Sequence, residues 1–103
     1  MAAVSPENLP PAEALSALCL RWRIKELSLF GSLARGEAAP TSDADVLIAF
    51  EVGEHWDLWD MVDLRDDLER LFGRTVDVVL EGAIRNPIRL RSIMRDKRLL
   101  YAA

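Results

Sequence analysis

An apolar run from Val46 to Phe50 follows directly on two aspartates, Asp43 and Asp45. Such a run is typical of a strand that is buried on both faces. The pattern predicts this strand over 43–50. Asp43 also fits an ordinary polar turn before a strand. Asp45 is harder to explain in that way, because the apolar run follows it at once and aspartate is depleted in strands.

Changes in apolar spacing and a series of capping residues mark the other elements. A helix is expected from Pro10-Pro11 to about Arg21, a short strand over 26–30, and a helical turn after Gly31-Ser32. The next expectations are a helix over 57–72 stopped by Gly73, a strand over 75–80, a helix from Asn86-Pro87 to about Lys97, and a short final strand over 99–101. The apolar stripe of the helix over 57–72 is expected to comprise Leu58, Met61, Val62, Leu68, Leu71 and Phe72. The predicted fold class is therefore α/β (α+β), a small mixed sheet of three to four strands covered by helices.

Length, charge and cysteine content exclude several classes of protein. The 103 residues suit a single domain over 1–103, and no apolar run approaches the roughly 20 residues of a membrane span. The net charge of −4 argues against nucleic acid as the partner, because a phosphate backbone would repel most of the surface. Cys19 is the only cysteine and the first residues carry no secretory signal, so a cytoplasmic location is expected.

Three aspartates form the candidate catalytic group. Asp43 and Asp45 are two residues apart in a strand, so they point to one face, roughly 7 Å apart. Asp77 stands in the otherwise apolar strand over 75–80, and a buried strand aspartate needs a basic partner, such as Arg35 or Arg74, or a metal ion. If the two strands are neighbours, the aspartates form a three-carboxylate cluster that suits magnesium.

Gly31 and Ser32 are the candidate phosphate-binding residues. They follow a strand directly and open a helical turn, where glycine allows a ligand to approach the backbone and free amide hydrogens face an anion. The Ser32 hydroxyl adds one donor. A Gly-Ser pair after a strand is common, so this signal is weak without the aspartates.

Taken together, these residues resemble the minimal nucleotidyltransferase family of the DNA polymerase β-like superfamily. The resemblance lies in Gly31-Ser-Leu-Ala-Arg-Gly36, in Ser42-Asp-Ala-Asp45 with its apolar run, in Leu71 to Val79, and in Arg85-Asn-Pro-Ile88. It implies the nucleotidyltransferase (polymerase β-like) fold and a metal-dependent enzyme with ATP as substrate. It also implies that Asp43, Asp45 and Asp77 hold two Mg²⁺ ions, and that Gly31 and Ser32 bind the β- and γ-phosphates. Arg35 could reach a phosphate, with a salt bridge to Glu37 as the alternative.

The family also implies a partner for this chain. Minimal members are typically the antitoxin of a toxin–antitoxin pair whose toxin is an all-helical HEPN-type ribonuclease, and the characterised mode is transfer of AMP to a toxin tyrosine (AMPylation). Two other functions stay open. One is a non-catalytic antitoxin that neutralises its partner by contact, and the other is an enzyme acting on a small molecule or an RNA end. The chain could form a homo- or hetero-oligomer with any of these functions.

Two surface features allow both a structural and a functional interpretation. Trp56 and Trp59 lie one helical turn apart and suit either packing at the helix start or partner contacts. The segment 85–98 concentrates positive charge in Arg85, Arg89, Arg91, Arg95, Lys97 and Arg98 against the single acid Asp96. Such a helix face is usually only solvated, but here it could favour a triphosphate or an acidic partner.

Overall fold

The computed structural model describes residues 9–37, 39 and 41–103, and the sequence-based expectations on residues 1–8 lie outside this part. The elements in chain order are α1 (Ala12–Arg21), β1 (Ile24–Phe30), α2 (Gly31–Arg35), β2 (Ala44–Phe50), α3 (Leu58–Phe72), β3 (Val76–Leu80), the 3-10 turn η2 (Glu81–Ala83), α4 (Pro87–Asp96) and β4 (Arg98–Ala102). The strands form one four-stranded sheet in the order β3-β2-β1-β4. β1 is antiparallel to both β2 and β4, whereas β2 and β3 are parallel. The predicted mixed sheet covered by helices is therefore confirmed.

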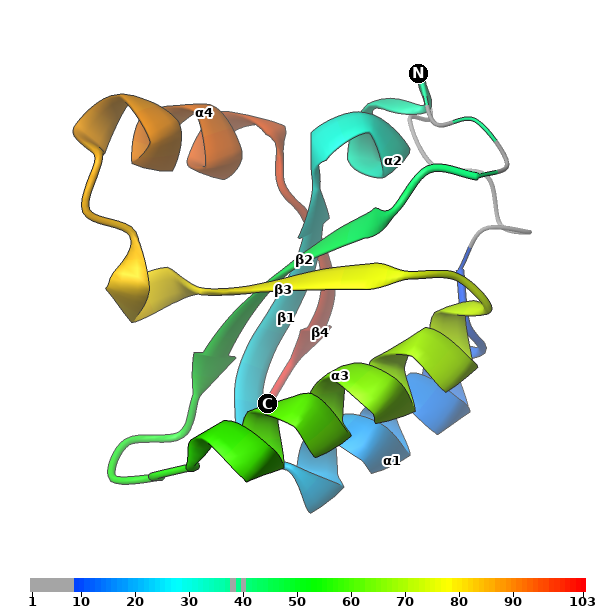
Figure 1. The fold of residues 1–103 in the computed structure, drawn as a ribbon, viewed down its shortest axis with the longest axis vertical. Coiled ribbons are helices and arrows are strands. Elements are labelled where there is room, and N and C mark those ends of the chain that lie inside the picture. The colour runs from blue at the N-terminus through cyan, green and yellow to red at the C-terminus, as the bar shows by residue number, and fades with distance from the viewer. Residues whose placement is uncertain (1–8, 38, 40) are drawn as a thin grey trace.

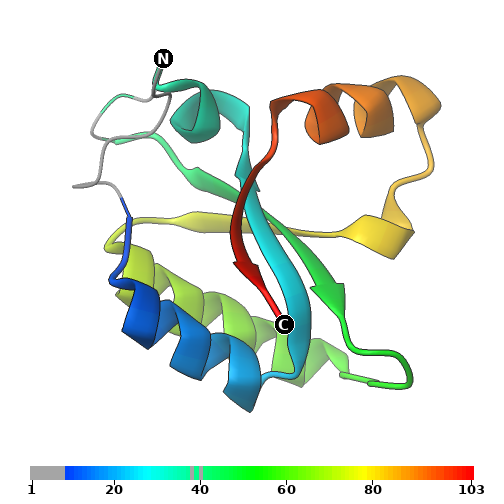
Figure 2. The ribbon, with the colours of Figure 1, turned by 180° about the vertical axis from the view of Figure 1, so that it is seen from behind.

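The helices form a layer on each side of the sheet. α1 and α3 lie side by side on one side, and α2 and α4 lie on the other (Figure 1 and Figure 2). This arrangement covers both faces of the central strands β1 and β2. Val46, Leu47 and Ile48 of β2 are buried, as the apolar run predicts, and the inner strand β1 buries even the polar residue Ser28.

The apolar core has two parts, one on each side of the sheet. The larger part joins α1 and α3 to the sheet through residues such as Leu15, Leu64 and Leu68. The smaller part joins α4 to the sheet and consists of Phe30, Leu47 and Ile93. Cys19 lies in the larger part, where burial raises the pKa of its thiol to about 12. A thiol that stays protonated is unreactive, so Cys19 has a packing role.

Helix α3 begins and ends as its sequence predicts, but part of its predicted apolar stripe is wrong. Asp57 and Asp60 form a reciprocal capping box at its start, and Gly73 ends it in the left-handed conformation with φ 70°. Leu64 is fully buried although the predicted stripe omitted it, whereas Leu58 is 75% exposed. An α-helix turns about 100° per residue. Leu58 lies six residues before Leu64, which places it about 120° away around the helix axis and off the buried face.

The ends of α4 also follow the local sequence. The Asn86 side chain accepts hydrogen bonds from the backbone N–H groups of Ile88 and Arg89, and Pro87 occupies the first turn. The predicted final strand is confirmed as β4, which pairs with β1. The turn η2 between β3 and α4 was not predicted.

Trp56 and Trp59 have different surroundings. Trp56 packs against Trp22, with ring centroids 5.1 Å apart, whereas Trp59 is 76% exposed. The packing interpretation therefore holds for Trp56.

No helix in the described part of the chain is long and apolar enough to cross a membrane.

Candidate active site

The predicted site residues meet at one end of the sheet. β1 and β2 are antiparallel, so the end of β1, which leads into Gly31, lies beside the start of β2, with Phe30 opposite Asp45. β3 runs parallel to β2, and Asp45 lies directly opposite Asp77. The sequence left open whether the strands of Asp45 and Asp77 are neighbours. In the sheet, β2 and β3 are neighbours.

The carboxylates of Asp45 and Asp77 face the side of the sheet that carries α2 and α4. Residues two apart in a strand share a face, and Leu47, two residues after Asp45, packs with Phe30 and Ile93 beneath α4. Residues paired across neighbouring strands also share a face, so Asp77 points the same way as Asp45. The candidate site is therefore a sheet surface next to the first residues of α2.

Gly31 allows α2 to begin in close contact with Asp45. Its φ is 73°, a conformation that side chains with a Cβ rarely adopt. A Cβ built on Gly31 would overlap the Asp45 Oδ2 atom and would lie 3.1 Å from Asp45 Cγ. Two independent constraints, backbone conformation and space, therefore require glycine at this position.

The electrostatics of the site centre on Asp45. Its pKa is raised, first because burial disfavours the charged carboxylate and then because the charges of Asp77 and Asp43 repel it, while Arg35 and Arg89 act in the opposite direction. The three carboxylates thus interact across two strands and the turn before β2. A divalent cation would relieve this repulsion.

The donor set fits magnesium. Among the residues that the structure describes, no three His, Cys, Asp or Glu side chains are gathered closely enough to hold a metal ion by themselves. Magnesium commonly takes only one or two protein carboxylates, and waters and substrate phosphates complete its shell. Half-buried Asp45 with two acidic neighbours can supply such ligands.

Asp77 is not buried, contrary to the sequence-based expectation. The strand β3 lies at the edge of the sheet, and the Asp77 side chain there is exposed. Water therefore solvates its charge, so a basic partner is not required. An exposed carboxylate at this edge can be reached by a second molecule.

The two arginines named as alternatives have other contacts. Arg35 donates from Nε to Glu37 Oε1 at 2.9 Å and from Nη1 to Asp96 Oδ2 at 3.3 Å, which confirms the salt bridge to Glu37. Arg74 donates to the backbone oxygen of Ser42 at 3.0 Å and so supports the turn that precedes Asp43.

Sequence reasoning did not single out Arg89 as a residue of the site. It lies on α4, one helical turn before the buried Ile93, and its charge acts on Asp45. The spacing of four residues between Arg89 and Ile93, directly after the Asn-Pro cap, was the signal that could have identified it. From the sequence alone, the position of α4 over the sheet is unknown, so Arg89 cannot be distinguished from the other five basic residues in the segment 85–98.

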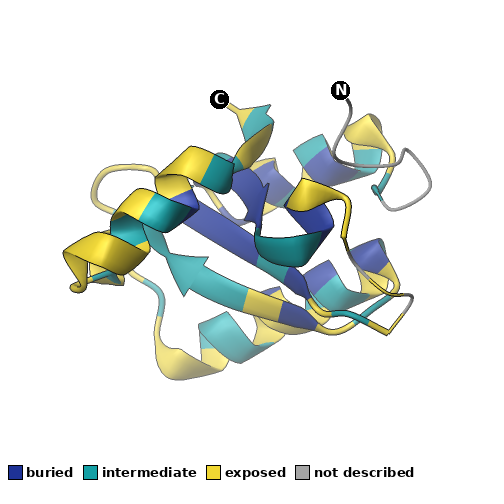
Figure 3. Ribbon diagram, turned by 90° about the horizontal axis from the view of Figure 1, so that it is seen from above, coloured by how far each residue is buried: buried dark blue, intermediate teal, exposed yellow. Residues whose placement is uncertain are grey.

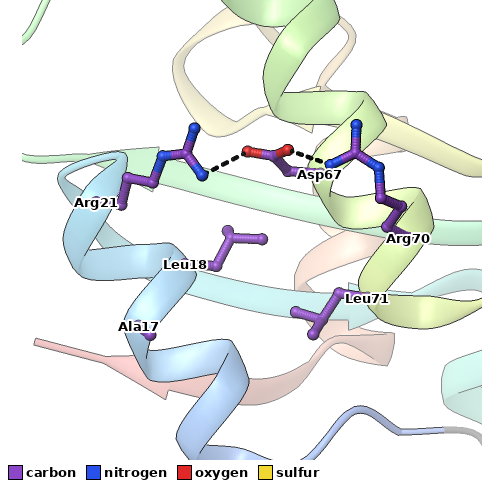
Figure 4. Close-up of a pocket in the computed structure, with 6 residues that line it drawn as sticks. All are labelled: Ala17, Leu18, Arg21, Asp67, Arg70 and Leu71. Carbon is purple, nitrogen blue, oxygen red and sulfur yellow. Dashed lines mark hydrogen bonds and ion pairs between the residues drawn. The ribbon is translucent and has the colours of Figure 1, made fainter.

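A separate pocket lies on the opposite side of the sheet, between α1 and α3 (Figure 4). Arg21 and Arg70 both bind Asp67 there, at 3.5 Å and 3.1 Å, above the apolar residues Leu18 and Leu71. Trp22 Nε1 also donates to Asp67 Oδ2 at 3.0 Å. These contacts join the two helices, and none of the site aspartates Asp43, Asp45 and Asp77 lines this pocket.

Comparison with known proteins assigns the family. Residues 12–100 match the nucleotidyltransferase domain family. A relative from Thermococcus cleftensis, protein adenylyltransferase MntA, is 36% identical over 76 residues that cover 74% of each chain. This chain therefore belongs to the nucleotidyltransferase domain family.

Solved structures agree with this fold. One, provisionally described as a minimal nucleotidyltransferase, is 39% identical with a TM-score of 0.69, and the match covers 84% of this chain and 86% of that one. Another is an MNT antitoxin in complex with a tri-AMPylated HEPN toxin from Shewanella oneidensis, with 15% identity and a TM-score of 0.63. That match covers 89% of this chain and 70% of the other, and at this identity it supports the fold alone.

Proposed function

We propose that this chain, acting as one domain, is a protein adenylyltransferase that transfers AMP from Mg–ATP to a hydroxyl group of a HEPN-type toxin. The observation that carries the proposal is the direct contact between the start of α2 at Gly31 and Asp45, with Asp77 opposite Asp45 on the next strand. The Thermococcus relative, a protein adenylyltransferase, supports the reaction class. The proposed partner follows the Shewanella complex, in which an antitoxin of the same fold is bound to an AMPylated HEPN toxin.

Each residue of the site has a role in this reaction. Asp43, Asp45 and Asp77 would hold two magnesium ions, which neutralise the triphosphate and stabilise the attacking and leaving oxygens. The backbone at Gly31 and the Ser32 hydroxyl would bind the β- and γ-phosphates. Asp77, exposed at the edge of the sheet, would help to activate the acceptor hydroxyl and would take up its proton.

The reaction is an in-line displacement at the α-phosphorus. The acceptor oxygen forms a bond to this phosphorus while the bond to the bridging oxygen between the α- and β-phosphates breaks. Pyrophosphate leaves with the bond electrons, and AMP stays on the acceptor. The protein contributes position and charge and forms no covalent bond of its own.

A second candidate function is neutralisation of the toxin by contact alone. The observation in its favour is Trp59, a large apolar side chain that is 76% exposed at the start of α3. Tryptophan is enriched at the energetic centres of protein interfaces. Both functions place the chain in the cytoplasm with its toxin, in a complex of the two proteins.

Replacing two site carboxylates separates the two functions. The Asp43→Asn/Asp45→Asn variant keeps the size of both side chains and removes their charges. The matched control is Asp63→Asn/Asp66→Asn, which removes two exposed charges from α3 on the other side of the sheet. The ribonuclease activity of the HEPN partner is measured after incubation with each protein and Mg–ATP.

If the chain is an enzyme, the wild type and the control protein abolish the ribonuclease activity, and the site variant leaves it intact. If the site variant neutralises the toxin as well as the control does, contact is sufficient and the catalytic proposal is wrong.

A further inference from the structure

The arginine in the glycine motif, Arg35, connects α2 to α4. Arg35 is the last residue of α2, and its guanidinium binds Glu37 at 2.9 Å and Asp96, the last residue of α4, at 3.3 Å. Asp96 is only half-exposed and also accepts from Arg95 Nε at 3.4 Å. The guanidinium of Arg35 is therefore held between two carboxylates, and this position fixes the end of α4 beside the start of the site.

Arg89 lies on the side of α4 that faces the sheet. Ile93, one turn later, is 5% exposed and packs on Phe30 and Leu47. Side chains four residues apart lie on one face of a helix, so Arg89 projects over the same side of the sheet as Asp45. Most of α4 is exposed, Arg89 included, and Ile93 is its buried residue (Figure 3).

The beginning of α4 is fixed, and the guanidinium of Arg89 is not engaged. The Asn86 side chain accepts from the Arg89 backbone N–H at 3.3 Å and from that of Ile88 at 2.9 Å. Arg89 forms no ion pair with any residue in the described part of the chain. Its side chain is exposed, one helical turn before the residue that packs α4 on the sheet. The backbone is thus held in place while the cation is available to a ligand.

We propose that Arg89, and not Arg35, is the arginine that binds a phosphate group of the nucleoside triphosphate. Three neighbouring carboxylates repel a triphosphate, so a cation opposite them is needed beside the metal ions. A guanidinium suits this role because it can donate two parallel hydrogen bonds to phosphate oxygens. Arg35 is then a positioning residue that keeps α4, and with it Arg89, over the site. This assignment rests on the proposed function for the identity of the ligand.

Calorimetric binding of Mg–ATP and of inorganic pyrophosphate to the purified chain tests the assignment. The variants are Arg89→Gln and Arg35→Gln, with Arg91→Gln as the matched control. Arg91 is exposed on the same helix, two residues before Ile93, so it lies on another face. Thermal unfolding of all four proteins shows whether a variant acts through stability. Binding does not depend on an acceptor protein, so it can be measured without the toxin.

Arg89→Gln is expected to raise the Kd of both ligands about tenfold or more and to leave the Tm unchanged, because a hydrogen bond to a charged group is lost. Arg89→Lys is expected to recover part of the affinity. Arg35→Gln is expected to lower the Tm slightly and to change the Kd less than Arg89→Gln does, while Arg91→Gln resembles the wild type.

The assignment is overturned if Arg89→Gln binds both ligands within twofold of the wild type, or if Arg35→Gln weakens binding more than Arg89→Gln. In either case the proposed function stands, because the wild type still binds the triphosphate. If the wild type binds neither ligand, both the assignment and the proposed function are wrong.

Discussion

Replacing Gly31 with alanine tests the most specific feature of the site, the contact between the start of α2 and Asp45. The substitution has two consequences. The first is backbone strain, because φ at Gly31 is 73° and an L-residue in this region costs about 1–2 kcal/mol. The second is overlap of the new Cβ with Asp45 Oδ2, so the Asp45 side chain must rotate away.

Gly73→Ala is the matched control, because it separates these two consequences. Gly73 has a φ of 70°, almost that of Gly31, but a Cβ built there meets no atom within 4 Å. It therefore reports the backbone strain alone, about 1–2 kcal/mol. Gly31→Ala adds a side chain forced off its rotamer, about 0.5–1.5 kcal/mol, for a total of about 1.5–3.5 kcal/mol.

Urea unfolding and AMP transfer are measured on both variants and on Gly31→Ala in an Asp45→Ala background. Removal of the Asp45 carboxylate relieves the overlap, so in that background Gly31→Ala should cost no more than Gly73→Ala. Transfer by Gly31→Ala should fall by about 100-fold, because a displacement of about 1 Å at a reacting centre has an effect of this size. Gly73→Ala should transfer AMP at the wild-type rate. If Gly31→Ala is equally destabilising in both backgrounds, or if it is fully active, Gly31 does not hold the start of α2 against Asp45.

Further variants test the buried charge of Asp45, the orientation of α3 and the cap of α4. Burial and neighbouring charges raise the pKa of Asp45, so the folded protein binds this proton more tightly than the unfolded chain, and stability falls as the pH rises through the raised pKa. Without metal, Asp45→Asn should therefore have a higher Tm than the wild type at pH 7, and the two Tm values should become equal below about pH 4. A lower Tm of the variant at pH 7 would contradict the burial of a charged Asp45. Leu64→Ala should lower the free energy of unfolding by about 2–5 kcal/mol, and Leu58→Ala by less than about 0.5 kcal/mol, as measured by chemical unfolding. Similar losses for the two variants would show that α3 is rotated about its axis. Asn86→Ala should lower the free energy of unfolding by about 1 kcal/mol, because the cap of α4 is lost. An unchanged Tm would contradict the hydrogen bonds that Asn86 accepts from Ile88 and Arg89.

The sequence predicts local structure well where short-range chemistry determines it. The capping box at Asp57, the glycine stop at Gly73 and the Asn86-Pro87 cap each fix a helix end through groups within a few residues. The apolar run after Asp45 likewise predicts a strand that is buried on both faces, and Val46, Leu47 and Ile48 are buried. These signals are sufficient for the order of the elements and for the fold class.

Features that depend on the arrangement of elements in space could not be predicted in the same way. Asp77 is exposed because β3 is an edge strand, and the order of strands in a sheet is not encoded in any one strand. Leu58 has the spacing of an apolar stripe, but the direction of α3 over the sheet leaves it exposed. Arg89 acts on Asp45 only because Ile93 anchors α4 on that side of the sheet. In each case a long-range contact determines the outcome.

Label transfer shows whether the chain is an adenylyltransferase. The chain is incubated with magnesium and its HEPN partner, in parallel with ATP labelled at the α-phosphate and ATP labelled at the γ-phosphate. The Asp43→Asn/Asp45→Asn variant serves as the control. We expect the partner to be labelled from the α-phosphate only, and not by the variant. If no label is transferred while the two proteins still form a stable complex, or if the label comes from the γ-phosphate, the chain is not an adenylyltransferase of that partner.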